Sequence, residues 1–103
     1  MADEPRWKGI RYRTVNTTGQ VLSTPTRMYF AELAAGTHSQ QVSLYDHTRY
    51  PQNLITQLNA NAMERDYFPR RERITLPIER GVYVSYSHVP VGLTGPLTIG
   101  FMP

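Results

Sequence analysis

The sequence predicts an all-β protein: a small antiparallel β-sandwich (jelly-roll-like) or barrel of about seven short strands with a flexible N-terminal arm. Three observations support this prediction. Apolar and polar residues alternate over several short segments, which is the two-residue period of a half-buried strand. Turn-forming residues separate these segments every eight to twelve residues or so, a spacing typical of sandwiches and barrels. No long segment has the period of an amphipathic helix.

The chain has room for one domain, residues 1–103, with a mass of 11.8 kDa. Folding a chain of this size buries roughly two-thirds of its surface, so we expect a single core. Hydrophobic residues make up 40% of the chain and charged residues 18%, a balance that favours an ordered fold. Residues 1–7 precede the first alternating segment and hold two acids and a proline, so we expect them to form the arm.

The chain has no cysteine, which excludes disulfides and thiolate metal ligands and favours cytoplasmic synthesis. Residues 28–35 are the longest apolar-rich run, but Glu32 interrupts them and they are too short to span a bilayer. We therefore expect no signal peptide and no membrane association. The net charge is +3, and the basic residues are ten arginines and one lysine, accompanied by seven tyrosines. Arginine and tyrosine are enriched at protein interfaces, although a GC-rich genome would also replace lysine by arginine.

Alternation begins at Trp7 and predicts a first strand over residues 7–14, followed by a turn at 16–19 and a short strand at 20–23. Residues 26–35 contain helix-forming residues, but the segment is short and lacks a helical stripe. It is therefore predicted as a strand. Residues 41–46 form the next predicted strand. Residues 51–62 fit one face of either a helix or a strand, and we favour the strand. The charged residues 63–73 are predicted to form a surface connection.

Residues 73–87 carry the clearest strand signal and predict a β-hairpin. Its core-facing residues are predicted to be Ile74, Leu76, Ile78, Val82, Val84 and Tyr86. A three-residue loop, 79–81, would join the two strands, with Gly81 in the left-handed conformation. Pro77 lacks a ladder donor and indicates an edge or a bulge. Residues 97–101 are predicted as the last strand.

No residue is predicted to be catalytic, to ligate a metal or to hold a cofactor. The three histidines lack the spacing that places two ligands on one metal. Asp46 and His47 are adjacent, so on an extended backbone their side chains point apart, and turn chemistry explains them better than a catalytic pair. Glu64 and Asp66 could resemble a glycosidase pair, but the surrounding arginines favour surface ion pairs.

Residues 65–73 interleave arginines with Tyr67 and Phe68. Guanidinium groups bind phosphate and aromatic rings stack on bases, so nucleic acid is one possible partner. Three acids lie in or beside this segment, and mixed charge is more typical of a surface that faces another protein. We therefore favour a protein interface over a plain solvated loop, and both over a nucleic-acid site.

From about Thr26 onward, the segments MYFAELAAG, VSLYD, LITQLNA, ITLPIERGVYVSY and LTIGF resemble small β-rich virion proteins of tailed bacteriophages, especially capsid decoration or cement proteins. The resemblance implies a non-enzymatic structural protein, synthesised in the host cytoplasm and located in the virion. It also implies a homo-oligomer that binds the major capsid protein and stabilises the assembled shell.

The expected interface comprises the N-terminal arm and seven residues. They are Trp7, Arg65, Tyr67, Phe68, Arg70, Arg71 and Arg73. A head-to-tail connector or tail component is an alternative, because such proteins are similarly β-rich. A barrel that binds single-stranded nucleic acid through Tyr67, Phe68 and the nearby arginines is the alternative from a different class.

Overall fold

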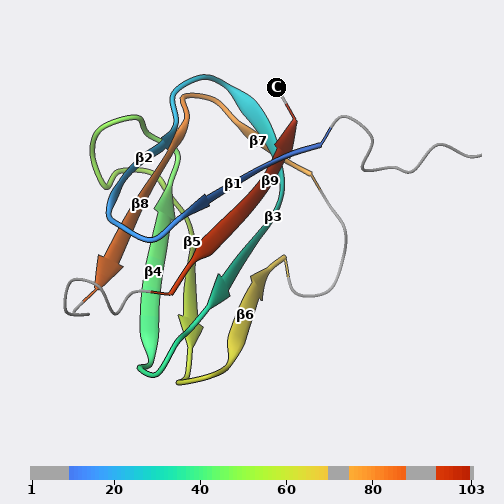
Figure 1. The fold of residues 1–103 in the computed structure, drawn as a ribbon. Helices are drawn as coiled ribbons and strands as arrows, with labels where there is room; N and C mark the ends of the chain where they lie inside the picture. Colours follow the sequence, from blue (N-terminus) through green and yellow to red (C-terminus); the bar gives the residue numbers. More distant parts are fainter. Residues whose placement is uncertain (1–9, 70–74, 88–94, 103) are drawn as a thin grey trace, which may run out of the picture.

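A computed structural model describes residues 10–69, 75–87 and 95–102, and these residues form two antiparallel sheets (Figure 1). The predicted all-β sandwich is confirmed, with nine strands in the described part rather than about seven. The strands are β1 (Arg11–Val15), β2 (Gly19–Leu22), β3 (Thr26–Ala34), β4 (Gln40–Tyr45), β5 (Leu54–Ala60), β6 (Arg65–Phe68), β7 (Leu76–Ile78), β8 (Val82–Ser87) and β9 (Leu97–Met102). The predicted N-terminal arm and Trp7 lie outside the described residues.

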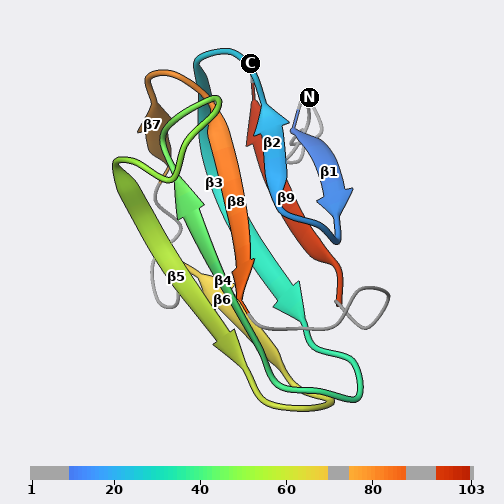
Figure 2. The same cartoon turned by 90° about the vertical axis from the view of Figure 1, so that its left-hand side faces the viewer.

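The two sheets form the two layers of the sandwich, which Figures 1 and 2 show from two sides. Sheet A has the order β1-β9-β3-β6, and sheet B has the order β2-β8-β4-β5. β7 also pairs with β3, opposite Thr26–Met28, whereas β6 lies opposite Ala31–Ala34. β6 and β7 therefore share the edge of β3 that β9 leaves free.

The strand order is that of a jelly roll. Four antiparallel pairs nest around the middle of the chain: β1 with β9, β2 with β8, β3 with β6, and β4 with β5. Winding these nested pairs into two layers places β9 beside β3 and β8 beside β4, as observed. β7 is an addition to this eight-stranded plan.

The core lies between the sheets and is built from alternate residues of the central strands. Its fully buried large side chains are Met28, Leu33, Val42, Leu44, Leu58, Val82, Val84, Leu97 and Ile99. Because successive side chains of a strand point to opposite faces, the residues between these project outward. This alternation defines the outer face of each sheet.

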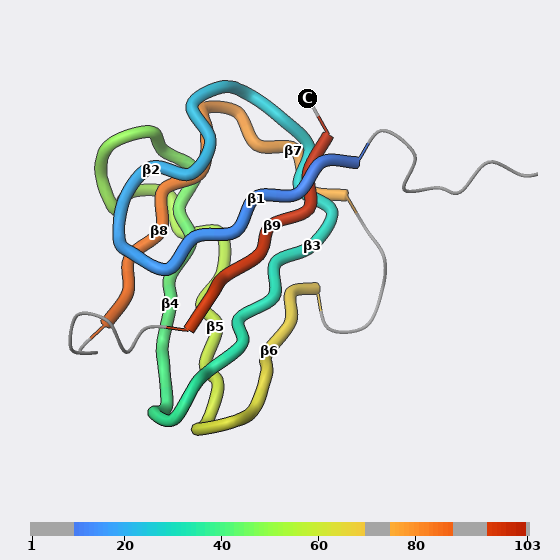
Figure 3. The backbone as a smooth tube through the Cα atoms, in the orientation of Figure 1, coloured from blue at the N-terminus to red at the C-terminus, as the bar shows by residue number. Residues whose placement is uncertain are grey.

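The predicted hairpin at residues 73–87 is wrong for its described part, 75–87; Arg73 and the predicted core residue Ile74 lie outside the described residues. β7 pairs with β3 in sheet A, while β8 pairs with β2 and β4 in sheet B. The chain therefore crosses from one layer to the other at residues 79–81, as Figure 3 shows between β7 and β8. Ile78 and Val82 still face one core, so a hairpin and a crossover have the same periodicity. Pro77 lies on an edge strand, as its missing donor predicts.

The other predicted elements hold within the described residues, with one exception; residues 7–9 of the predicted first strand lie outside them. Residues 26–34 and 54–60 are strands, which settles the two ambiguities between helix and strand. The exception is the predicted surface connection 63–73, because Arg65–Phe68 forms strand β6, while residues 70–73 lie outside the described residues. The charged residues of this segment hid the strand alternation, because the inward-facing residue Asp66 is itself charged although it is buried.

Polar side chains join the two sheets at both sides of the sandwich. On one side, the Arg13 guanidinium donates to the Val21 carbonyl oxygen at 2.9 Å, which links β1 to β2. On the other, the buried Asp66 carboxylate accepts from the backbone amides of Asn59 (2.9 Å) and Tyr67 (3.0 Å), which links β6 to β5. These two charged residues stabilise the fold, and Asp66 is not half of a surface acid pair.

Tyr86 makes a third link between the layers, and its replacement by phenylalanine tests that link. Its hydroxyl lies 3.1 Å from the Val15 carbonyl oxygen and 3.0 Å from that of Gly95. We expect Tyr86→Phe to lower the free energy of unfolding by about 1 kcal/mol, because a partly buried hydrogen bond is lost. Chemical denaturation at neutral pH measures this loss.

The same variant tests the stability at high pH. Burial raises the pKa of Tyr86 to about 12, although a backbone hydrogen bond at Leu97 lowers it in part. Between pH 10 and 12 the unfolded chain loses the tyrosine proton while the folded chain keeps it, so rising pH favours unfolding. The difference in stability between the wild type and Tyr86→Phe should therefore shrink above pH 10. A constant difference up to pH 12 would contradict the buried environment of this hydroxyl.

Candidate protein interface on the outer face of sheet A

The outer face of sheet A carries three aromatic side chains. Tyr12 on β1, Phe30 on β3 and Tyr67 on β6 alternate with inward-facing neighbours, so they project away from the core. Tyr12 is 59% exposed and Tyr67 48%. The ring centroids of Tyr12 and Phe30 are 5.8 Å apart at an interplanar angle of 52°, a tilted aromatic contact. We call these three residues the aromatic platform.

Gly100 of β9 lies beneath the ring of Phe30. The register aligns Tyr12, Gly100 and Phe30 across three neighbouring strands. A Cβ atom at Gly100 would overlap the Phe30 ring, so the missing side chain lets that ring lie against the β9 backbone. The glycine thereby allows the two rings on either side of β9 to meet.

Polar and charged residues surround the aromatic platform. The hydroxyls of Thr14 and Thr98 are 3.0 Å apart across β1 and β9. Arg65 at the start of β6 forms an ion pair of 3.5 Å with Glu32 of β3, and Tyr67 lies directly opposite Glu32. An exposed pair of this kind adds little to stability, so it remains available to exchange partners with a docking protein.

The structure brings together only part of the interface predicted from the sequence. Arg65 and Tyr67 lie on the outer face of sheet A. Phe68 lies opposite Ala31, is half-buried and packs against the core. Tyr67 and Phe68 therefore point to opposite faces of β6 and cannot form one stacking surface. The other predicted residues, Trp7, Arg70, Arg71 and Arg73, lie outside the described residues.

Sequence reasoning missed Tyr12, Phe30 and Gly100. Tyr12 and Phe30 are far apart in the chain, and only the pairing of β1 with β9 and of β9 with β3 brings them together. The available signal was one glycine in an alternating segment, which can indicate a close approach by a neighbouring group. The sequence does not say which ring makes that approach.

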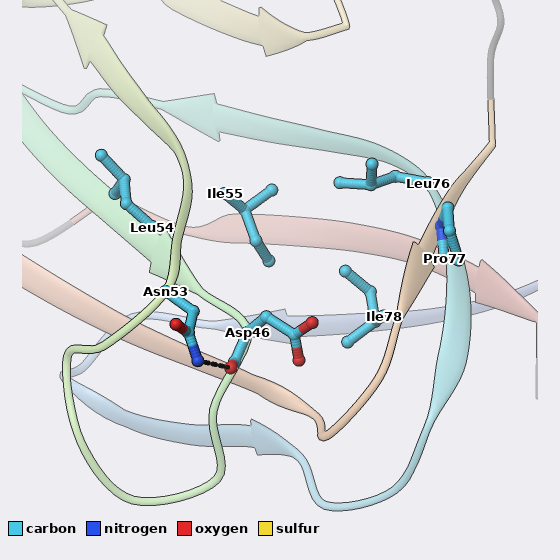
Figure 4. Close-up of a pocket in the computed structure, with 7 residues that line it drawn as sticks. All are labelled: Asp46, Asn53, Leu54, Ile55, Leu76, Pro77 and Ile78. Carbon is cyan, nitrogen blue, oxygen red and sulfur yellow. Dashed lines mark hydrogen bonds between the residues drawn. The ribbon is translucent and has the colours of Figure 1, made fainter.

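A hollow of about 300 Å³ lies between β5 and β7, at the edge of the sandwich opposite to β1. Figure 4 shows the side chains of Ile55, Leu76 and Ile78 directed into it. Its acidic residue, Asp46, uses both carboxylate oxygens to accept from backbone amides of residues 79–81, at distances of 2.9 to 3.4 Å. Because these bonds give the carboxylate a structural role at the crossover, the hollow is not our candidate site.

The two described histidines, His38 and His47, support the fold locally, and His88 lies outside the described residues. The Nδ1 atom of His47 accepts from the backbone amides of Arg49 (3.0 Å) and Tyr50 (3.1 Å), so the predicted turn chemistry is confirmed. Nδ1 of His38 bonds the Thr37 hydroxyl at 2.9 Å. Within the described ranges, no three histidine or acidic side chains gather closely enough to hold a metal ion.

Comparison with protein-family models, with curated proteins and with solved structures gives no match for this chain. In the part of the chain that the structure describes, no helix is long and apolar enough to cross a membrane. Fold and surface together define a small all-β jelly roll with an aromatic and arginine-bearing face. Jelly rolls serve many unrelated functions, so the function of this chain depends on the residues of the face itself.

Proposed function

We propose that this chain is a non-enzymatic structural protein of a phage particle, which binds the assembled capsid and stabilises it as a decoration protein. The observation that carries the proposal is the aromatic platform beside the Arg65–Glu32 ion pair. Exposed tyrosines flanked by arginine are typical binding hot spots between proteins. The partner would be the major capsid protein, and a homo-oligomer would present several platforms at once, which raises avidity.

The mixed charge around the platform favours a protein partner over nucleic acid. Glu32 lies directly opposite Tyr67 and pairs with Arg65, so a phosphate backbone would meet a carboxylate beside the ring. A protein surface can present both signs of charge and pair with each of them. The inward orientation of Phe68 further weakens the stacking surface on which the nucleic-acid alternative depended.

The copy number of the chain in purified particles of the source virus tests the proposal. We expect quantitative mass spectrometry to find a number comparable to that of the major shell subunit, because a decoration protein covers repeated joints of the shell. A few copies per particle would overturn this in favour of a connector or tail component. Absence from the particles would overturn the virion proposal altogether.

A further inference from the structure

The outer face of sheet B carries no charged side chain at its described strand positions. Alternation with the buried residues of β4 and β8 assigns the outward positions. They are Gln20, Gln41, Ser43, Tyr45, Leu54, Gln57, Asn59, Tyr83, Ser85 and Ser87. Ser43 is covered by its neighbours and only 6% exposed, so the other nine form the accessible surface. In a chain whose composition is 18% charged, a run of ten uncharged positions on one face is unexpected, because charged residues normally concentrate at the surface.

The pairing register arranges these side chains in three rows. The first row crosses all four strands and consists of Gln20, Tyr83, Tyr45 and Leu54. The second row consists of Ser85, Ser43 and Gln57, and the third of Ser87, Gln41 and Asn59. An aromatic and apolar row therefore lies beside two rows of hydroxyl and amide groups. We call this surface the neutral face.

The neutral face suits a ligand without charge. A charged ligand would lose hydration there and find no opposite charge in return. Hydroxyl and amide side chains both donate and accept hydrogen bonds, as the 3.2 Å bond from the Gln57 amide to the Ser43 hydroxyl illustrates. Partners that also donate and accept at every polar group match them best, and sugar hydroxyls have this property.

The tyrosines add the second requirement of sugar binding. The electron-rich face of an aromatic ring attracts C–H groups, which line the flat side of a sugar ring. Tyr83 and Tyr45 are paired across β8 and β4 at the centre of the first row, and both are partly exposed. Leu54, 61% exposed, extends this row to the edge of the sheet.

The size of the neutral face also favours a slender ligand. The four strands are spaced about 4.8 Å apart, with one outward residue on β2 and three on each of β8, β4 and β5. They give a face of roughly 400 Å² at most once side chains are included. A stable protein interface usually buries about 800 Å² on each partner. The face is therefore small for a second copy of the chain, but long enough for a short stretch of an extended polymer.

We propose that the neutral face binds a neutral polysaccharide chain, with Tyr83 and Tyr45 beneath the sugar rings and the amide and hydroxyl rows beside their hydroxyl groups. This site is on the sheet opposite the aromatic platform. It is therefore independent of the proposed capsid contact, and either proposal can fail alone.

Native gel electrophoresis of the full chain through gels that contain a polysaccharide tests this site. The probes are four neutral polymers, namely mannan, laminarin, soluble starch and hydroxyethyl cellulose, with alginate as the anionic comparison. We expect at least one neutral polymer to slow the protein, and the slowing to persist in about 0.3 M salt, where exposed charges are largely screened. Tyr83→Ala should weaken that apparent affinity at least tenfold. Met63→Ala, which removes a 77% exposed side chain in the turn after β5, should leave it unchanged.

Thermal unfolding of each variant verifies that it folds, and Tyr45→Ala serves as the second test should Tyr83→Ala unfold. Slowing by alginate alone, lost in salt, would overturn the proposal, since the arginines of this basic protein would then account for it. Full retention of affinity by the tyrosine variants would also overturn it. The proposal would also be overturned if sedimentation showed that the wild type is a dimer and that Tyr83→Ala is not. A second copy of the chain would then occupy the face.

Discussion

Replacing Asp46 by alanine is expected to lower the free energy of unfolding by about 2 to 3 kcal/mol and the midpoint of thermal unfolding by about 10 to 15 °C. Its carboxylate accepts from the amides of Glu79 (3.0 Å), Arg80 (2.9 Å) and Gly81 (3.4 Å), where the chain passes from sheet A to sheet B. Hydrogen bonds to a charged acceptor are stronger than neutral ones, and three donors lose their acceptor together.

The backbone of Asp46 adds to its importance. Its amide donates to the Asn53 carbonyl oxygen at 2.8 Å, and its own carbonyl oxygen accepts from the Asn53 side chain at 3.3 Å (Figure 4). One residue thus connects the end of β4, the loop that leads to β5 and the crossover. The crossover itself is tightly fitted, because a Cβ atom on Gly81 would overlap the Leu22 carbonyl oxygen. The φ of Gly81, +156°, is also one that other residues rarely adopt. It differs from the predicted left-handed turn conformation.

Two variants control the experiment on Asp46. Asp46→Asn keeps one acceptor oxygen and should lose about half as much stability as Asp46→Ala. Glu79→Ala removes an exposed acid from the same crossover and should change stability by less than about 0.5 kcal/mol. Denaturant unfolding of the three variants gives the comparison. Equal, small losses for Asp46→Ala and Glu79→Ala would show that the carboxylate does not stabilise the crossover.

Most strands could be predicted because their residues alternate. The crossover between β7 and β8 could not, because it depends on strand pairing. Alternation states which residues face the core, and it did so for Ile78 and Val82. It does not state which strand lies beside them, because both layers of a sandwich face the same core. Pairing is decided by contacts between segments distant in sequence, such as β7 with β3. Strand β6 was missed for a related reason, since the hydrogen bonds that satisfy Asp66 involve the tertiary fold.

The candidate surfaces were less predictable than the fold. Sequence reasoning chose a cluster of neighbouring arginines and aromatic residues, but strand geometry separates Tyr67 from Phe68 and leaves only one of them at the surface. The platform and the neutral face instead combine residues from different strands. A surface of that kind depends on strand order and register, which local patterns do not contain.

The double variant Tyr12→Ser with Tyr67→Ser is expected to weaken binding to the assembled shell at least 100-fold. Central tyrosines commonly contribute about 2 kcal/mol or more each when removed from an interface, and a 100-fold change corresponds to about 2.7 kcal/mol. Both side chains are about half exposed, so the variant should remain folded. Co-sedimentation with shells that lack the protein, over a range of concentrations, measures the affinity.

Tyr50→Ser is the matched control for the platform. Tyr50 is 55% exposed, but it lies in the loop between β4 and β5 and contacts His47 rather than sheet A. Its replacement should leave shell binding unchanged, whereas the platform variant should lose it without a loss of the folded state. If the two variants bound equally well, the platform would not be the contact. If both lost binding, the shell would contact a wider surface than sheet A offers, because two tyrosines on separate elements would then both be required.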